Sequence, residues 1–315
     1  MPSADARGNH DADPDRPLRT LVAVVLNWCA EEDSVRAIGS LLAEATPGLT
    51  VLLVDNASPD GSGPRLAARH PQLPYLQTGA NLGYAGGNQR AIDWALERGA
   101  DAVLLMNDDA ELRPGCLQAL RDALERDPSL GACAPTLVFA PPHDARVWWA
   151  GGDFVAHRAV GTHRHLGTAL STLPPASGPV PVSALCGCVI LLRAQALRAV
   201  GGLREEFFAY AEDTELSVRL ACGGWGIAWV PGAVAIHHLP FPEPAPSPWA
   251  ITQRDRNRRL LARLHLRGGA RARFRAWYYP TRLLLVARYL ATGDRARAAA
   301  VWRGMTAPLP AATGG

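Results

Sequence analysis

The chain has 315 residues, 48% of them hydrophobic and 19% charged, which is typical of a globular protein. All 32 basic residues are arginine, and this excludes a lysine Schiff base, attachment of pyridoxal phosphate and the lysine of a P-loop. The net charge of +3 is unevenly distributed: residues 251–315 contain fourteen arginines and two acids, a net +12, so residues 1–250 carry −9.

The first 17 residues are polar and rich in Asp, Pro and Ala, and we expect a disordered lead-in there and no signal peptide. No apolar run reaches the ~20 residues that span a bilayer. The six cysteines lack metal-ligand spacing. We therefore expect reduced, mostly buried thiols in a cytoplasmic protein, with peripheral contact at the inner face of the membrane as an option.

Short apolar runs alternate with amphipathic stretches over the first 110 residues. Strands that are apolar on both faces and alternate with helices indicate an α/β fold, with a Rossmann-like, mostly parallel central sheet covered by helices on both faces. The predicted strands are 21–27, 49–55, 73–78 and 101–108, and the predicted helices are 31–45, 60–70 and 84–99.

The pattern changes beyond residue 140. There we expect a hairpin at 145–155 that turns at Gly151-Gly152, followed by a mobile loop at 157–179 and a buried strand at 182–193. Two helices at 193–202 and 211–224 and two short strands at 227–231 and 233–238 come next. A Pro-rich linker at 240–248 precedes two or three Arg-rich amphipathic helices at 249–304. The predicted domains are thus the lead-in 1–17, a domain at 18–240 with halves 18–110 and 111–240, and a helical region at 241–315.

Polar residues follow all four predicted strands of the first half. Because the carboxyl ends of parallel strands meet at one edge of a sheet, these side chains could form one cation site. The alternative is a set of solvated loops and helix caps, which Pro114 also suggests. The repetition at four strand ends favours the site, whose residues would be Asn27, Asp55-Asn56, Asn81 and Asn107-Asp108-Asp109.

Such a site suits a sugar carried on a nucleoside diphosphate. Mg²⁺ and Mn²⁺ prefer carboxylate and phosphate oxygens, and Mn²⁺ also accepts imidazole. A cation about 4 Å from a phosphate charge contributes ~4 kcal/mol at an effective dielectric of about 20. No side chain of a core without lysine supplies as much.

Six stretches, in order along residues 20–265, carry a family resemblance. They are "VVLNW" with "VLLVDNASPDGS" (51–62), "NLGYAGGNQRAI" (81–92), "LLMNDDAEL" (104–112), "CGCVILLRAQALRAVGGLREEFFAYAEDTELSVRL" (186–220), "GWGIAWVPGAVAIHH" (224–238) and "RDRNRRLLARLH" (254–265). In these the chain resembles the family-two glycosyltransferases, inverting enzymes of the GT-A fold, and within them the rhamnosyltransferase-like branch. The resemblance implies a nucleotide-binding half at 18–110, an acceptor half at 111–240 and a C-terminal helical extension.

The resemblance implies a donor site in the first half. Asp55 would hold the pyrimidine base or its ribose, beside Asn27 and Asn56. A loop at a helix start would approach the sugar nucleotide closely, because glycine lacks a side chain; it comprises Asn81, Gly83, Gly86, Gly87 and Asn88. A strand-end turn and a flexible loop are the simpler explanations of these two stretches.

The resemblance also implies a metal site. Asn107, Asp108 and Asp109 match the DxD-type motif, with Asn107 where many relatives have Asp. Asp109 would ligate Mg²⁺ or Mn²⁺, and Asp108 and Asn107 would lie near the ribose or the diphosphate. One of the two histidines at 237 and 238 would reach the metal or diphosphate, and we favour His237 over an imidazole that merely packs.

The catalytic base implied by the resemblance is Asp213, which would remove the proton of the acceptor hydroxyl. Glu212 would position the acceptor or the base, and Trp225 could stack on the acceptor sugar. The alternatives are that the two acids only complement the helix dipole and that the tryptophan only packs in the core.

The predicted function is an inverting glycosyltransferase that moves a sugar from a dTDP- or UDP-sugar, with dTDP-rhamnose or a related deoxysugar as first choice. The acceptor could be a glycan, a lipid-linked glycan or a small natural product, and not nucleic acid. A sugar-phosphate nucleotidyltransferase would instead show a Gly-rich loop after the first strand and a lysine, and an oxidoreductase would show GxGxxG. A non-catalytic sugar-nucleotide-binding protein is the third alternative.

The Arg-rich tail has three interpretations. Helices around residues 274–291 could lie on an anionic membrane that holds a lipid-linked acceptor. They could equally present solvated faces while they pack on the core, or they could meet a second subunit of a homo-oligomer.

Overall fold

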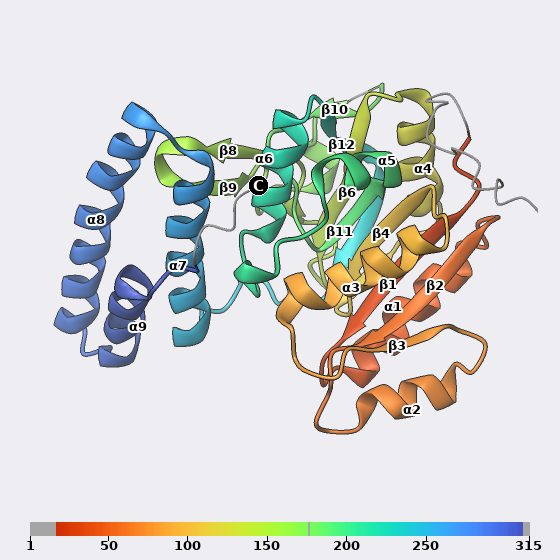
Figure 1. Cartoon of the computed structure of the whole chain (residues 1–315), viewed down its shortest axis with the longest axis horizontal. Coiled ribbons are helices and arrows are strands. Elements are labelled where there is room, and N and C mark those ends of the chain that lie inside the picture. Colours follow the sequence, from red (N-terminus) through yellow and green to blue (C-terminus); the bar gives the residue numbers. More distant parts are fainter. Residues whose placement is uncertain (1–16, 176, 311–315) are drawn as a thin grey trace, which may run out of the picture.

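The computed structural model describes residues 17–175 and 177–310. It shows a mixed sheet flanked by helices, with three further helices set to one side (Figure 1). The predicted lead-in at 1–17 lies outside the described residues, except for its last residue.

The first half of the sheet confirms the predicted alternation of strands and helices. Four parallel strands lie in the order β3-β2-β1-β4, namely β1 (Leu21–Asn27), β2 (Leu49–Asp55), β3 (Tyr75–Gln77) and β4 (Ala102–Asn107). The helices between them are α1 (Glu31–Ala43), α2 (Ser62–Arg69) and α3 (Gly83–Glu97). All seven residues of β1 are buried, as a strand apolar on both faces requires. Asn27 pairs in register with Asp55, so their polar ends meet.

The second half of the sheet is mixed. From β4 the order continues with β11 (Val189–Arg193), which runs antiparallel to β4 and to its other neighbour β6 (Leu130–Phe139). The next strand is β12 (Gly226–His237), which runs parallel to β6. The edge pieces are β10 (Val180–Pro181), β5 (Ala110–Leu112) and β7 (Val147–Trp149), and the helices are α4 (Cys116–Arg126), α5 (Ala194–Val200) and α6 (Glu212–Cys222).

The pairing of β5 with β12 brings two distant segments together. In this antiparallel pair His237 lies opposite Ala110, and the backbone N–H of His238 donates to the carbonyl oxygen of Asp109 at 2.7 Å. The end of β12 is thereby fixed beside the acids that follow β4.

The predicted hairpin at 145–155 is wrong. Val147–Trp149 join β6 as β7, while β8 (Gly152–Val155) pairs with β9 (Val160–His163) in a separate two-stranded sheet. Trp149 is buried in the core, and Gly151, with φ +90°, lies between the two strands. The stretch expected as a loop at 157–179 therefore contains β9.

Two other local predictions are corrected. The strand expected at 182–193 begins only at Val189. The two short strands expected at 227–231 and 233–238 form the single strand β12, whose register shifts between Val230 and Val234, where Pro231 and Gly232 interrupt the regular ladder.

The C-terminal region consists of α7 (Pro248–His265), α8 (Gly268–Ala291) and α9 (Arg295–Thr306). These helices share an apolar cluster distinct from the core around the sheet, although Phe207 and Ala159 join it. Figure 1 shows α8 as the outermost of the three. Within the described ranges, no helix combines the length and the apolar character that crossing a membrane would take.

Candidate active site

Asp55, at the end of β2, is buried and surrounded by protein donors. Its Oδ1 accepts from Asn27 Nδ2 at 3.0 Å and from Ser58 Oγ at 2.5 Å, and its Oδ2 accepts from Gln77 Nε2 at 3.0 Å. Asn27 is itself fully buried, and its Oδ1 accepts from Ser34 Oγ at 3.2 Å. The Asn27 side chain is thus committed to orienting Asp55, which leaves Asp55 as the better candidate for direct contact with a ligand.

Asn56 organises the loop that leads into α3. Its Nδ2 donates to the carbonyl oxygen of Gly83 at 3.1 Å and to Asn81 Oδ1 at 3.2 Å. Gly83 has φ +70°, and a Cβ at this position would lie 2.4 Å from the carbonyl oxygen of Phe208. Only glycine fits there, so the loop at 81–83 can lie against the segment that precedes α6.

The other predicted loop residues lie on the first turns of α3. Gly86 is tightly packed, since a Cβ would lie 2.7 Å from Leu82 Cβ. Asn88 is buried and its Nδ2 donates to the carbonyl oxygen of Tyr84 at 3.0 Å. Its Oδ1 has no hydrogen-bond partner among the described residues.

Asn107 is the last residue of β4, and Asp108 and Asp109 connect β4 to β5. Burial and the charge of Asp109 raise the pKa of Asp108 to about 7. Burial also acts to raise the pKa of Asp109, but the nearby His237 imidazole outweighs it and the pKa falls below its ordinary value. His237 Nε2 lies 3.2 Å from Asp109 Oδ1. The two acids therefore differ in pKa, and Asp109 is the one that favours the charged form.

These groups fit a divalent cation. Asn107 Oδ1, Asp109 Oδ1 and His237 Nδ1 are buried without a hydrogen-bond partner in the described part of the chain, although His237 Nε2 lies 3.2 Å from Asp109 Oδ1. His238 Nε2 instead pairs with Glu111 at 2.9 Å, which supports the choice of His237. The described residues contain no group of three or more His, Cys, Asp or Glu placed to hold a metal. Asp109 and His237 could therefore supply two ligands, with phosphate and water as the others.

Asp213 lies in the first turn of α6 and is held by three donors. Its Oδ2 accepts from the backbone N–H of Gly187 at 2.9 Å, and its Oδ1 accepts from the N–H of Thr214 at 2.5 Å and from its hydroxyl at 3.2 Å. Tyr84 donates its hydroxyl to the carbonyl oxygen of Gly187 at 2.5 Å. The backbone N–H and C=O of Gly187 therefore connect Asp213 to Tyr84 on α3.

Glu212 is buried beside Asp213, with its Oε2 lacking a partner among the described residues. Burial, and then the charge of Asp213, raise the pKa of Glu212 well above its ordinary value. A carboxyl group in this state is protonated near neutral pH and can donate a hydrogen bond.

The three-residue segment Cys186–Cys188 connects the pair Asp108 and Asp109 with the pair Glu212 and Asp213. Asn107 donates its backbone N–H to the carbonyl oxygen of Cys188 at 2.9 Å, and one residue earlier Gly187 donates to Asp213. The buried thiol of Cys186 between them has a raised pKa, caused by burial and by the surrounding charges, which include Asp213 and Asp109. Asp109 and Asp213 are thus both close enough to the Cys186 thiol to act on its pKa.

The structure does not bring Trp225 to this region. Trp225 immediately precedes β12, whereas His237 is the last residue of that strand. The two ends of β12 pair with Leu130 and Phe139, nine residues apart on β6, so they lie roughly 30 Å apart at about 3.3 Å per residue. Trp225 packs near Gly131 and Leu220 instead. The role on the acceptor that we predicted for it is therefore not favoured.

Other aromatic side chains do lie near the acids. The ring of Trp148 packs edge-on against His237, with centroids 4.4 Å apart. Trp249, which is half exposed, contacts Phe208 and Tyr210 just before Glu212. The sequence pattern gave no signal for these contacts, because β7 and α7 reach the site from distant parts of the chain.

Asn257 on α7 was also missed. Its Nδ2 donates to the carbonyl oxygens of Phe207, Ala209 and Tyr210, at 2.7, 2.8 and 2.7 Å. Phe208, Tyr210 and Ala211 all have positive φ. The only sequence signal was the resemblance of "RDRNRRLLARLH", which assigned no role to this residue.

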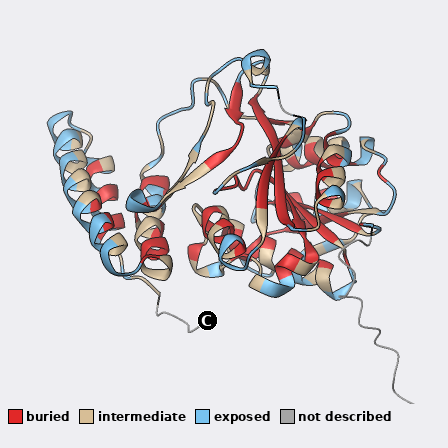
Figure 2. Ribbon diagram, turned by 90° about the horizontal axis from the view of Figure 1, so that it is seen from above, coloured by how far each residue is buried: buried red, intermediate tan, exposed pale blue. Residues whose placement is uncertain are grey.

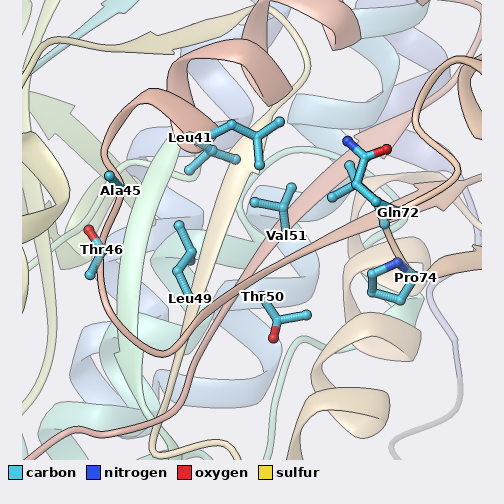
Figure 3. Close-up of a pocket in the computed structure, with 10 residues that line it drawn as sticks. Leu41, Ala45, Thr46, Leu49, Thr50, Val51, Gln72 and Pro74 are labelled. Carbon is cyan, nitrogen blue, oxygen red and sulfur yellow. The ribbon is translucent and has the colours of Figure 1, made fainter.

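A pocket of about 300 Å³ lies elsewhere. Its lining includes Leu41 of α1, Val51 of β2 and Gln72 (Figure 3). Val51 lies toward the amino end of β2, whereas Asp55 lies at its carboxyl end. The pocket is thus separate from the acidic region and does not mark the candidate site.

Two family models match the chain: glycosyl transferase family group 2 over residues 102–308 and glycosyl transferase family 2 over residues 24–166. The N-acetylglucosaminyl-diphospho-decaprenol L-rhamnosyltransferase of Mycobacterium tuberculosis is 34% identical over 220 residues, which cover 64% of this chain and 71% of that enzyme.

Two solved structures share the fold. GalNAc-T7 with UDP, GalNAc and Mn²⁺ has a TM-score of 0.63 at 11% identity, and the match covers 90% of this chain and 54% of GalNAc-T7, about half its length. A mannosyltransferase from Pyrobaculum calidifontis in complex with GDP-Man and Mn²⁺ has a TM-score of 0.56 at 17% identity and covers 93% of this chain and 87% of that chain.

Proposed function

This chain belongs to glycosyl transferase family 2 and is a glycosyltransferase of the rhamnosyltransferase-like branch, and we propose that it transfers a deoxyhexose from a pyrimidine nucleotide-sugar to an acceptor hydroxyl with inversion. The observation that carries the proposal is the Cys186–Cys188 segment, which holds Asp213 on one side and the Asn107–Asp109 turn on the other. A base and a diphosphate site on opposite sides of one sugar ring are what direct displacement needs.

Asp213 is the proposed general base. Its carboxylate is oriented by the donors on Gly187 and Thr214, so that it can accept the proton of the acceptor hydroxyl as that oxygen attacks the anomeric carbon. Protonated Glu212 would donate a hydrogen bond to the acceptor, and so would fix which hydroxyl faces Asp213.

The donor would be held by the first half of the sheet. Asp55, kept in place by Asn27 and Ser58, would contact the pyrimidine or its ribose. Asp109 and His237 would hold Mg²⁺ or Mn²⁺, which when bound offsets the negative charge that develops on the departing diphosphate. Both solved neighbours contain Mn²⁺, and the buried, unpartnered oxygens on Asn107 and Asp109 support the same chemistry here.

The relative's name supports a rhamnose-type donor and a lipid-linked acceptor. That relative acts on a decaprenol-linked sugar and transfers L-rhamnose. We therefore propose dTDP-rhamnose or a related dTDP- or UDP-deoxysugar as the donor, and a lipid-linked glycan as the acceptor.

A donor screen tests the proposal. The full chain is incubated with a panel of dTDP-, UDP- and GDP-sugars, with Mn²⁺, Mg²⁺ or EDTA, and release of the nucleoside diphosphate is measured. We expect a pyrimidine deoxysugar to turn over, EDTA to abolish turnover, and Asp213→Asn to lower kcat by about 10²–10⁴ with little change in donor KM. Turnover by Asp213→Asn at the rate of the unchanged chain would refute the proposed base.

A further inference from the structure

The outer face of α8 carries a continuous exposed apolar stripe. Residues three or four positions apart lie on one face of a helix. On the outer face of α8 these residues are alanine, leucine, tyrosine and proline. Leu283, Leu284 and Leu290 are 51%, 70% and 55% exposed. We call this set the α8 stripe; it comprises Ala276, Tyr279, Pro280, Leu283, Leu284, Ala287, Leu290 and Ala291, all exposed. Figure 2 shows the outer side of this helix largely in the colour of exposed residues.

Contacts on the inner side fix the rotation of α8. Phe274 and Tyr278 are buried in the cluster shared with α7 and α9. Tyr278 donates its hydroxyl to the carbonyl oxygen of Asp255 at 3.1 Å, and Arg282 forms an ion pair with the Asp255 carboxylate at 3.1 Å. The α8 stripe is therefore held away from the protein core by a packed opposite face.

The surroundings of the stripe are cationic. Arg273 and Arg275 lie at its first turns and Arg288 near its last, and all three are exposed. The sequence from Arg256 to Gly293 contains no Asp or Glu. An apolar stripe bordered by arginine is the pattern of a helix that lies in the plane of a membrane interface.

We propose that the α8 stripe docks on an anionic bilayer surface, with its leucines at the boundary of headgroups and acyl chains and its arginines on lipid phosphates. A second copy is the other occupant to consider. A symmetric contact through the stripe would bring arginines of two copies together, with no acid on either α8 to pair with them, so charge complementarity favours the lipid. The inference rests on α8 alone and goes beyond the proposed transfer reaction.

Vesicle binding tests the inference. The full chain is sedimented with vesicles of phosphatidylcholine alone and with vesicles that contain 30% phosphatidylglycerol. We expect binding to the anionic vesicles to weaken as salt rises, and to fall at least tenfold in Leu283→Gln/Leu284→Gln. Arg273→Gln/Arg275→Gln should weaken it by about fivefold for each arginine. Leu42→Gln is the matched control, because Leu42 is 44% exposed on α1, far from the stripe in the sequence.

Three outcomes would overturn the inference. They are failure of the unchanged chain to bind anionic vesicles, equal loss in Leu42→Gln and in the double leucine variant, and a dimer in solution that Leu283→Gln/Leu284→Gln dissociates, which would assign the stripe to a second copy. Nucleoside diphosphate release from a soluble donor, measured on the same samples, should stay unchanged. It therefore separates a failure of docking from a failure of the proposed function.

Discussion

Asn257 Nδ2 donates to the carbonyl oxygen of Tyr210 at 2.7 Å, and so a C-terminal helix holds the turn that leads into the proposed base. Tyr210 and Ala211 have φ values of 71° and 70°, in a region that L-residues rarely adopt. Such a conformation persists only when surrounding contacts impose it. The α7 helix therefore helps to hold the backbone just before Glu212 and Asp213, although it follows the sheet in sequence.

Asn257→Ala should lower kcat more than it lowers donor affinity. The change leaves the buried carbonyl oxygen of Phe207 and the part-buried ones of Ala209 and Tyr210 without this donor, at a cost of about 1–3 kcal/mol in the free energy of unfolding. It also frees the turn that aims Asp213, while the donor residues on β2 stay in place. Thermal unfolding together with kcat and donor KM checks this prediction.

Thr252→Val is the matched control for Asn257. Thr252 Oγ1 donates to the carbonyl oxygens of Pro248 and Ala300, on the same helix but away from the turn. We expect a comparable loss of stability with kcat nearly unchanged. If Thr252→Val loses kcat to the same degree, Asn257 has no specific part in positioning the turn.

His237→Ala should raise the Mn²⁺ concentration needed for half-maximal turnover by about tenfold or more, because one of the two proposed protein ligands is lost. His238→Ala is the control, since His238 is the next residue but pairs with Glu111. Metal titrations of both variants, followed by nucleoside diphosphate release, make the comparison. A similar shift in both would remove His237 from the metal site.

The sequence predicts the first half of the fold well, because its strands and helices are marked by patterns of neighbouring residues. Each of the strands β1 and β2 has the predicted bounds, because a run that is apolar on both faces and ends in a polar residue can be read from neighbouring positions. Asn107, Asp108 and Asp109 were found in the same way, as polar residues at a strand end, whereas the roles of Glu212 and Asp213 came from the family resemblance.

What could not be predicted depends on pairing between distant segments. Trp149 joins β6 and so breaks the expected hairpin, and Trp225 lies at the far end of β12, which no short window of sequence reveals. Asn257 reaches the turn at 207–210 from about fifty residues away. The apolar stripe on α8 could be read as a buried face, and only the packing of Tyr278 shows that the other side is the buried one.

Gly63→Ala should weaken donor binding. A Cβ at Gly63 would lie 2.2 Å from Asp55 Cγ, so the carboxylate that is proposed to hold the pyrimidine would have to move. We expect a rise of about tenfold in donor KM, and some loss of stability, because an overpacked site costs about 1–3 kcal/mol. Gly39→Ala on α1 is the control, since nothing lies within 4 Å of its added Cβ, and it should be neutral or slightly stabilising. Donor titrations on both variants would contradict the role of Asp55 if KM stayed the same in Gly63→Ala.

Glu212→Gln should stabilise the protein more at about pH 8 than at about pH 5. In the folded chain, burial and the charge of Asp213 raise the pKa of Glu212 above its ordinary value of 4.5. As the pH rises past 4.5, the unfolded chain releases this proton while the folded chain retains it, so stability falls with pH until the raised pKa is reached. Glutamine removes that dependence, and each kcal/mol regained would raise the melting temperature by about 2–4 °C.

Melting curves of both proteins at the two pH values give the difference. Glu97→Gln is the control for loss of one surface charge, because Glu97 is an exposed glutamate on α3. A gain that is equal at both pH values would mean that Glu212 is not held protonated, and its proposed hydrogen bond to the acceptor would lose its basis.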